Sequence, residues 1–247
     1  MLFMPLKFEL AVQNSAGMRI AHEVGAARVE LAQALTLGGL TPSPATIESV
    51  VAAASDNGPE THVLVRPRAG DFRYDDDEIA VVVRDIRHAL AAGVRGVVVG
   101  CQDASGALNR DGLARMVDAA DGAPVTLHRV IDVTPDPIAS LQLARELGVC
   151  RVLSSGGASR AIDGLEVLRT LVAEAAGGIE VMAGSGITAS DVTTIAATGV
   201  DAVHFSAKRT VTSDDSVRMG SADDGVGGYE ITDRDTALAV VRALAYA

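Results

Sequence analysis

The amino-acid sequence predicts a single (β/α)8 barrel of the TIM type, an α/β fold that spans residues 1–247 as one domain. Three observations predict it. Short apolar segments recur along the chain, and each leads into a polar or glycine-rich turn and then a helical segment. Eight such units follow one another in the same order, and 247 residues is a usual length for this barrel. An open doubly wound sheet is the alternative, but it rarely carries eight regular units.

The predicted strands are the apolar segments that turn residues bound on both sides. They cover residues 7–13, 28–32, 62–68, 96–100, 125–130, 151–157, 180–186 and 202–207. The predicted helices cover residues 15–24, 44–54, 75–92, 110–120, 136–147, about 162–175, a segment after Thr188, and about 233–245.

Local signals support these boundaries. Thr41 or Ser43 can cap the second helix, and the acidic residues 75–78 suit the positive end of the third helix dipole. Glycines such as Gly148 stand where a helix ends just before a strand, a position that favours a positive φ. One segment, 208–229, breaks the pattern. It follows the last strand, so we expect a long loop at the barrel mouth, either a lid or disordered.

Composition limits the class of protein. With 48% hydrophobic residues, 3% aromatic residues and no Trp, the core must be aliphatic, as in helices packed on a parallel sheet. Lys and Arg total 21 against 32 Asp and Glu, a net charge of −11 that argues against nucleic acid or an anionic membrane as partner.

Other features of the sequence indicate the compartment. No apolar run approaches the roughly 20 residues of a membrane span, and residues 1–5 are too short for the apolar part of a secretory signal. Cys101 and Cys150 lie at different strand ends, so we expect free thiols in a reducing compartment, and a cytoplasmic protein.

The candidate site residues stand at the carboxyl ends of strands, the face that carries the active site in this fold. They are Glu9, Glu30, Arg66, Arg68, Asp71, His128, Arg129, Asp132, Ser155, Gly156, Gly184, Gly186, His204 and Ser206. Mixed charge at one mouth suits acid–base chemistry on a small anionic molecule.

Among these residues, His128 is assigned general acid–base work, and His204 a second site role at its strand end. Glu9, Glu30 or Asp132 would orient the imidazole or act as the partner acid.

The remaining candidates indicate anion binding. Arg66, Arg68 and Arg129 would clamp negative charge, with Asp71 beside the first two. The glycine-rich turns at 154–157 and 183–186 precede helices, and their backbone N–H groups could cradle a phosphate; a turn that merely needs small residues would look the same.

Glu9 and Glu30 also have a structural interpretation. Both lie inside strands, where a carboxylate is costly to bury unless it is paired, for instance with Arg66 or Arg129. An ion-pair network inside the barrel would explain all four residues without a ligand.

The motifs in their order resemble the CutC family of copper homeostasis proteins, from about residue 7 to residue 208. They are Glu30-Leu31, GGLTPS at 38–43, RPRAGDFRY at 66–74, His128-Arg129 with Asp132, LSSG at 153–156, MAGSG at 182–186 and HFSA at 204–207. The resemblance implies a TIM-type barrel, a cytoplasmic location, a homodimer or larger homo-oligomer, and the handling of copper.

The sequence departs from the family where copper would bind. Family members often carry cysteine just after the glutamates of the first two strands, but Ala11 and Ala32 occupy these places. Because Cu(I) prefers thiolate and thioether ligands, we expect no dedicated Cu(I) site and assign no metal ligand, although Cys101 lies at the mouth end of the fourth strand.

Three functions therefore compete. The first is an enzyme or enzyme-like binder that acts on a small anionic metabolite with His and Glu acid–base chemistry, as a lyase, isomerase or hydrolase. The second is copper binding or delivery, which the resemblance implies. The third is a scaffold whose polar mouth is an ion-pair network. A barrel supports many reactions, so the fold alone does not choose among them.

Overall fold

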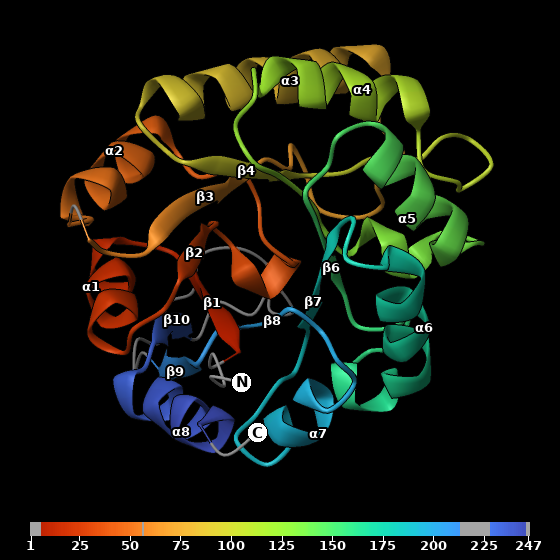
Figure 1. Cartoon of the computed structure of the whole chain (residues 1–247). Coiled ribbons are helices and arrows are strands. Elements are labelled where there is room, and N and C mark those ends of the chain that lie inside the picture. The colour runs from red at the N-terminus through yellow and green to blue at the C-terminus, as the bar shows by residue number, and fades with distance from the viewer. Residues whose placement is uncertain (1–5, 56, 213–227, 246–247) are drawn as a thin grey trace.

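The computed structural model describes residues 6–55, 57–212 and 228–245. Its centre is a closed barrel of eight parallel strands in chain order, which confirms the predicted (β/α)8 fold. The strands are β1 (Lys7–Val12), β2 (Arg28–Leu31), β3 (Glu60–Leu64), β4 (Gly96–Val99), β5 (Val125–Leu127), β6 (Arg151–Ser154), β7 (Glu180–Gly184) and β8 (Ala202–Phe205). Pairing of β1 with β8 closes the barrel (Figure 1).

Helices surround the strands, as Figure 1 shows. They are α1 (Ser15–Glu23), α2 (Pro44–Ala53), α3 (Asp76–Ala91), α4 (Arg110–Ala119), α5 (Pro137–Glu146), α6 (Leu165–Ala175), α7 (Val192–Ala196) and α8 (Arg234–Leu244). The short 3-10 helices are η1 (Leu35–Leu37), η2 (Arg129–Val133) and η3 (Ala161–Asp163). Ser43 caps α2, and Asp75 with Glu78 forms a capping box on α3.

The main hydrophobic core lies between the outer faces of the strands and the helices. The barrel interior is different, because charged side chains lie in it at the amino ends of the strands. Arg28 and Arg151 both donate to Glu180, at 3.2 and 2.6 Å, and Arg151 also donates to Thr126. A small apolar cluster of Leu153, Met182 and Ala202 completes this interior.

The strands are shorter than predicted at their carboxyl ends. The third ends at Leu64 and the fifth at Leu127, so Arg66 and His128 stand just beyond the regular strands. The end of the chain also differs from the expected loop. Residues 208–212 form β9 (Lys208–Thr212), which pairs antiparallel with β10 (Gly228–Thr232); the rest of the expected loop, 213–227, lies outside the described residues.

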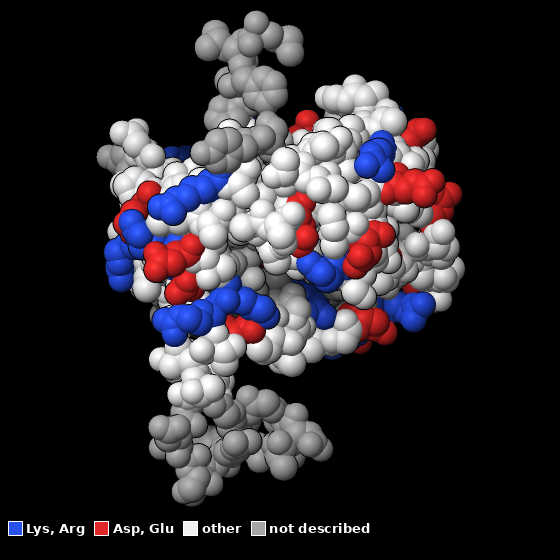
Figure 2. Space-filling model, turned by 90° about the horizontal axis from the view of Figure 1, so that it is seen from below, with Lys and Arg blue, Asp and Glu red and all other residues white. Residues whose placement is uncertain are grey.

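The surface carries both signs of charge side by side. On the face shown in Figure 2, Lys and Arg lie next to Asp and Glu and do not gather into one positive patch. Within the described ranges, no helix has both the length and the apolarity needed to cross a membrane.

Candidate functional site

A cavity of about 320 Å³ opens at the carboxyl ends of the strands. The predicted residues that line it are Glu30, Arg66, His128, Arg129, Gly186, His204 and Ser206. Sequence reasoning missed most of its apolar wall, which consists of Ala11, Leu35, Leu37, Leu64, Phe72, Leu153, Ile187 and Phe205. The strand pattern thus brings charged groups from distant parts of the chain to one mouth.

The most buried part of the site is a histidine between two glutamates. In the barrel register Glu9 lies beside Arg28 on β2 and beside His204 on β8. The Nδ1 of His204 donates to Glu9 at 2.8 Å, and Arg28 donates to the other oxygen of Glu9 at 3.1 Å. Glu9 therefore pairs with Arg28 and His204, and not with Arg66 or Arg129 as expected.

Glu30 completes this group from the other side of the imidazole. Its carboxylate lies 3.8 Å from the Nε2 of His204, too far for a hydrogen bond. Glu30 is only 6% exposed, yet it lines the cavity, and within the described part of the chain its carboxylate accepts no hydrogen bond. This carboxylate is therefore free to interact with a ligand.

The pKa values of the two glutamates are shifted in opposite directions. Burial raises the pKa of Glu30 to about 7, and the charge of Glu9 adds to this effect against the opposing pull of His204. Burial also acts on Glu9, but the hydrogen bond and charge of His204, together with Arg28, lower its pKa to about 2. Burial opposes the charged form of His204, but Glu30 and Glu9 outweigh it and raise its pKa. A pair of carboxyl groups pushed apart in this way is typical of acid–base sites.

His128 stands on the other side of the mouth as a neutral imidazole. Its Nδ1 accepts the backbone N–H of Val130 at 3.1 Å, so the proton belongs on Nε2. Burial and the charge of Arg66 lower its pKa to about 3. His128 is 5% exposed, and within the described chain its Nε2 has no hydrogen-bond partner. In this tautomer the imidazole offers an N–H donor and no free nitrogen lone pair, and its predicted general acid–base role stays a prediction.

Arg66 supplies positive charge and holds two loops. Its guanidinium donates to the carbonyl oxygens of Leu37, Gly39 and Gly70 at 2.8 to 3.0 Å, and it lies over the ring of Phe72. Among the described residues no carboxylate lies within salt-bridge distance of Arg66. Its charge is therefore unopposed by an ion-pair partner.

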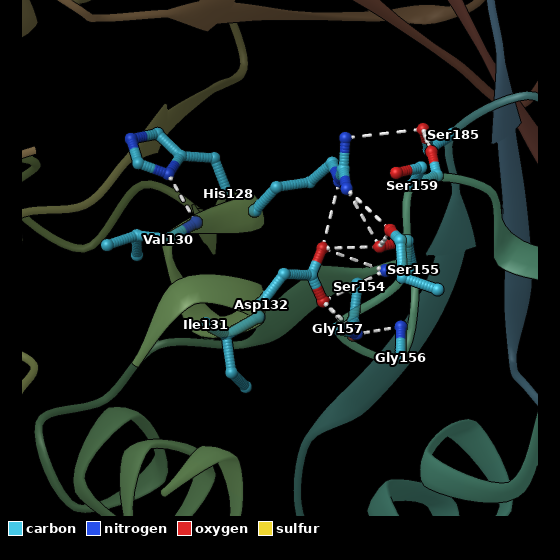
Figure 3. A network of polar contacts seen from close by, with 12 residues as sticks. His128, Val130, Ile131, Asp132, Ser154, Ser155, Gly156, Gly157, Ser159 and Ser185 are labelled. Carbon is cyan, nitrogen blue, oxygen red and sulfur yellow. Dashed lines mark hydrogen bonds and ion pairs between the residues drawn. The ribbon is translucent and has the colours of Figure 1, made fainter. Parts of the chain in front are cut away.

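Asp132 has a structural role at the turn after β6. It accepts hydrogen bonds from the hydroxyls of Ser154 and Ser155, from the backbone N–H groups of Ser155 and Gly157, and from Arg129 at 2.8 Å (Figure 3). The anion-binding donors predicted at this turn are thus already occupied by a carboxylate of the chain itself. Arg129 also donates to the hydroxyl of Ser185, which joins this network to the end of β7.

Close packing explains two of the predicted glycines. A Cβ on Gly156 would collide with the backbone of Gly164, at a φ of +71°. A Cβ on Gly184 would press on Leu153 and His204, so this glycine makes room for the histidine. Neither lines the cavity, whereas Gly186 does, and within the described chain its backbone N–H makes no hydrogen bond.

Arg68 and Asp71 also lie outside the cavity, as do the predicted residues Glu9, Asp132, Ser155, Gly156 and Gly184. Arg68 is paired with Asp71 at 3.0 Å and with Glu78, at the outer rim above α3. This ion cluster is half exposed, and neither Arg68 nor Asp71 is a cavity residue. In place of Arg68 the cavity has Lys208 of β9, which donates to Glu230.

Three charged side chains inside the barrel were not predicted. They are Arg28, Arg151 and Glu180, which stand at the beginnings of β2, β6 and β7, away from the mouth. The alternation of inward and outward residues could have found Arg28, since it is two positions from Glu30 and therefore on the same face of β2.

The donor atoms do not suit Cu(I). Both cysteines are free, as predicted, but Cys101 is buried against Asn109 and burial raises its pKa to about 12, while Cys150 is exposed before β6. Among the residues that the structure describes, the cavity lining contains no cysteine or methionine. Ligand atoms of Glu9, Glu30 and His204 lie within 4.8 Å of one another, but these are oxygen and nitrogen donors.

Comparison with known proteins gives a consistent result. The sequence model of the CutC family matches residues 6–209. A family protein CutC from Sinorhizobium medicae is 43% identical over 187 residues, which are 76% of this chain and 75% of that protein. A family protein CutC from Vibrio cholerae is 38% identical over 250 residues, 98% of this chain and 97% of that protein.

A solved structure supports the same relationship. The CutC protein from Streptococcus agalactiae, provisionally named a copper homeostasis protein, superimposes with a TM-score of 0.77 at 28% sequence identity. The match covers 81% of this chain and 97% of that one.

Proposed function

The chain belongs to the CutC family, and from this premise we propose that its barrel mouth binds a small anionic metabolite and carries out acid–base chemistry on it. Family membership does not specify a reaction, so the proposal rests on the residues of the mouth.

The positive charge of Arg66 at the cavity carries the proposal. Arg66, Arg129 and Lys208 all line a small cavity in a protein whose net charge is −11. Arg129 is paired with Asp132 and Lys208 with Glu230, whereas Arg66 has no carboxylate partner among the described residues. Glu30 is the one carboxylate among the lining residues, and its pKa of about 7 leaves it partly protonated at neutral pH. A positive pocket in an acidic protein favours a ligand of the opposite charge.

The size and the walls of the cavity indicate the kind of ligand. A volume of about 320 Å³ is at the small end of ligand pockets. Apolar side chains such as Leu64, Phe72 and Phe205 separate the charged groups, so the ligand needs a short carbon backbone between its polar ends.

Anion binding can be tested by thermal denaturation in the presence of inorganic phosphate, citrate and glycerol 3-phosphate. At least one of these should raise the melting temperature saturably, since a ligand that binds only the folded state stabilises it. Lys208→Gln removes a charge from the mouth and should weaken the effect. Lys7→Gln, an exposed position at the opposite end of β1, should not. The absence of any saturable shift would instead support the scaffold interpretation.

Copper handling is the second candidate, and the name given to the Streptococcus agalactiae relative favours it. The absence of sulfur from the described part of the cavity lining argues against a Cu(I) site there. Anaerobic Cu(I) titration against a competing chelator tests it: tight binding that is lost in Cys101→Ser would make copper the better interpretation.

The family resemblance also leads us to propose a cytoplasmic location and self-association into a homodimer or larger homo-oligomer. Light scattering coupled to size-exclusion chromatography tests the second of these proposals, and a monomeric mass would contradict it.

A further inference from the structure

We infer that the mouth removes a proton from a carbon next to a carbonyl group of its anionic ligand, with Glu30 as the general base and His128 as the donor to the carbonyl oxygen. This inference rests on the proposed function, because it names the reaction class of the same site.

Glu30 has the position of a base that acts on a ligand. It lies inside the barrel, lines the cavity and accepts no hydrogen bond from the described residues. His204 stands 3.8 Å away and is fixed by its bond to Glu9, which is itself held by Arg28. The carboxylate is thus both reachable and held by rigid barrel strands.

The proton affinity of Glu30 agrees with this role. A general base works best when its pKa lies near the working pH, and that of Glu30 is about 7. The groups that act on it are His204 on β8 and Glu9 on β1. The same cavity is lined by Arg66 after β3, His128 after β5, Arg129 of η2 and Lys208 of β9.

His128 is suited to polarise a carbonyl. Its imidazole is buried and neutral, and its Nε2–H lacks a partner in the described chain although a buried donor without one is costly. An acceptor oxygen of a ligand would satisfy it. A neutral imidazole paired with a carboxylate base is a known arrangement for moving a proton next to a carbonyl.

The topology sets the two groups on opposite walls. Glu30 belongs to β2, and His128 follows β5, three strands further round a barrel of eight. Both residues line the cavity, so a ligand of a few carbon atoms there lies between their side chains.

The proposed step balances without another reagent. The carboxylate of Glu30 takes the proton, the C–H electron pair becomes a C=C bond, and the carbonyl electrons move to oxygen as an enolate. His128 donates a hydrogen bond to that oxygen, and the positive charges of Arg66 and Arg129 favour it. Return of the proton from Glu30 to the same carbon restores the carbonyl compound and regenerates the carboxylate.

The lining residues offer little to competing chemistry. The described lining residues include no cysteine. The hydroxyl of Ser185 donates to the carbonyl of Ser159 and accepts from Arg129, and the amine of Lys208 donates to Glu230. Ser206 also lines the cavity, but no hydrogen bond joins its hydroxyl to a base in the described chain. A covalent nucleophile activated by an adjacent base is thus not evident among them.

Hydrogen–deuterium exchange in D2O, followed by proton NMR, tests the inference. The probes are dihydroxyacetone phosphate and pyruvate, which carry acidic C–H groups beside a carbonyl. Wild-type protein should exchange at least one of them about a hundredfold faster than buffer, the usual scale of general-base catalysis. The rate should rise with pH through about 7, as Glu30 loses its proton.

Variants separate the role of Glu30 from stability. Glu30→Gln should reduce the exchange rate to that of buffer. Glu30→Asp keeps a carboxylate but moves it away from the ligand, because its side chain is shorter, and should strongly slow the exchange. Glu166→Gln, on the exposed surface of α6, should exchange as the wild type does. Binding of glycerol 3-phosphate and lactate, the reduced forms of the probes, should persist in Glu30→Gln.

The outcomes distinguish the two proposals. If the wild type binds the reduced forms but exchanges neither probe, the inference is overturned and the proposed function stands. If it binds none of these anions and catalyses no exchange, both are overturned. Exchange that persists at the wild-type rate in Glu30→Gln overturns the assignment of the base.

Discussion

Replacing Glu30 with Gln is expected to stabilise the protein above neutral pH and to have much less effect in acid. The folded protein holds the proton of Glu30 more tightly than the unfolded chain, because its pKa rises from 4.5 to about 7 on folding. Stability from this group is therefore complete below the unfolded pKa and is lost as pH rises through the folded pKa. Glutamine, which does not ionise, avoids that loss.

The size of the effect follows from the pKa shift. A shift from 4.5 to about 7 corresponds to a loss of about 3 kcal/mol in the free energy of unfolding, once the pH is above both values. Most of this change falls between about pH 5 and about pH 8. The charge of His204 lowers the pKa of Glu30, which reduces the difference without reversing its sign.

The free energy of unfolding can be measured by urea denaturation. Far-ultraviolet circular dichroism is the signal to follow, because the chain has no Trp for fluorescence. The wild type and Glu30→Gln are compared at about pH 5 and about pH 8.5, with Glu166→Gln as the exposed control. The free energy of unfolding of Glu30→Gln should exceed that of the wild type by more at the higher pH than at the lower one. A gap that stays constant between the two pH values would refute the argument that burial raises the proton affinity of Glu30.

Three further substitutions test the packing around the site. Glu180→Gln should lower the free energy of unfolding by about 2–3 kcal/mol, because two buried arginines lose their shared negative charge and one of them loses its acceptor oxygen. Glu146→Gln, in an exposed ion pair, should cost less than about 1 kcal/mol in the same urea titration; equal losses would contradict the argument. Gly156→Ala should yield little folded protein on expression, whereas Gly122→Ala, also at a positive φ but in open space, should fold with a loss of about 1–2 kcal/mol. Asp132→Ala should cost about 3 kcal/mol or more in thermal denaturation, since several buried donors lose their acceptor; an unchanged melting temperature would show that the turn does not depend on it.

The fold could be predicted from the sequence because strand, turn and helix signals repeat eight times. Each predicted strand is present, although β3 and β5 end earlier than the apolar pattern suggested. Local sequence signals do not show where the hydrogen-bonded pairing of the strands ends. Val65, for example, is buried although it follows the last residue of β3. The pairing of residues 208–212 with 228–232 depends on contacts distant in the sequence, which no local pattern revealed.

The candidate site was predictable in its location more than in its roles. Strand ends placed Glu30, His128 and His204 at one mouth, as expected. Their roles depend on details that the sequence does not display: which nitrogen of His128 accepts Val130, and how burial divides the protons among the acids. For the same reason Asp132 could not be recognised as a turn residue, since its donors come from a loop more than twenty residues away.

The hydrogen bonds of Arg66 tie the proposed binding of a ligand to the structure of the surrounding loops. One guanidinium both places charge in the cavity and ties the segment around Leu37 to the one around Gly70. A change of ligand preference made at this side chain would also loosen both rims of the opening. Substitutions at Lys208 or along the apolar wall can therefore change ligand specificity more freely, because these side chains do not hold the two loops that Arg66 joins.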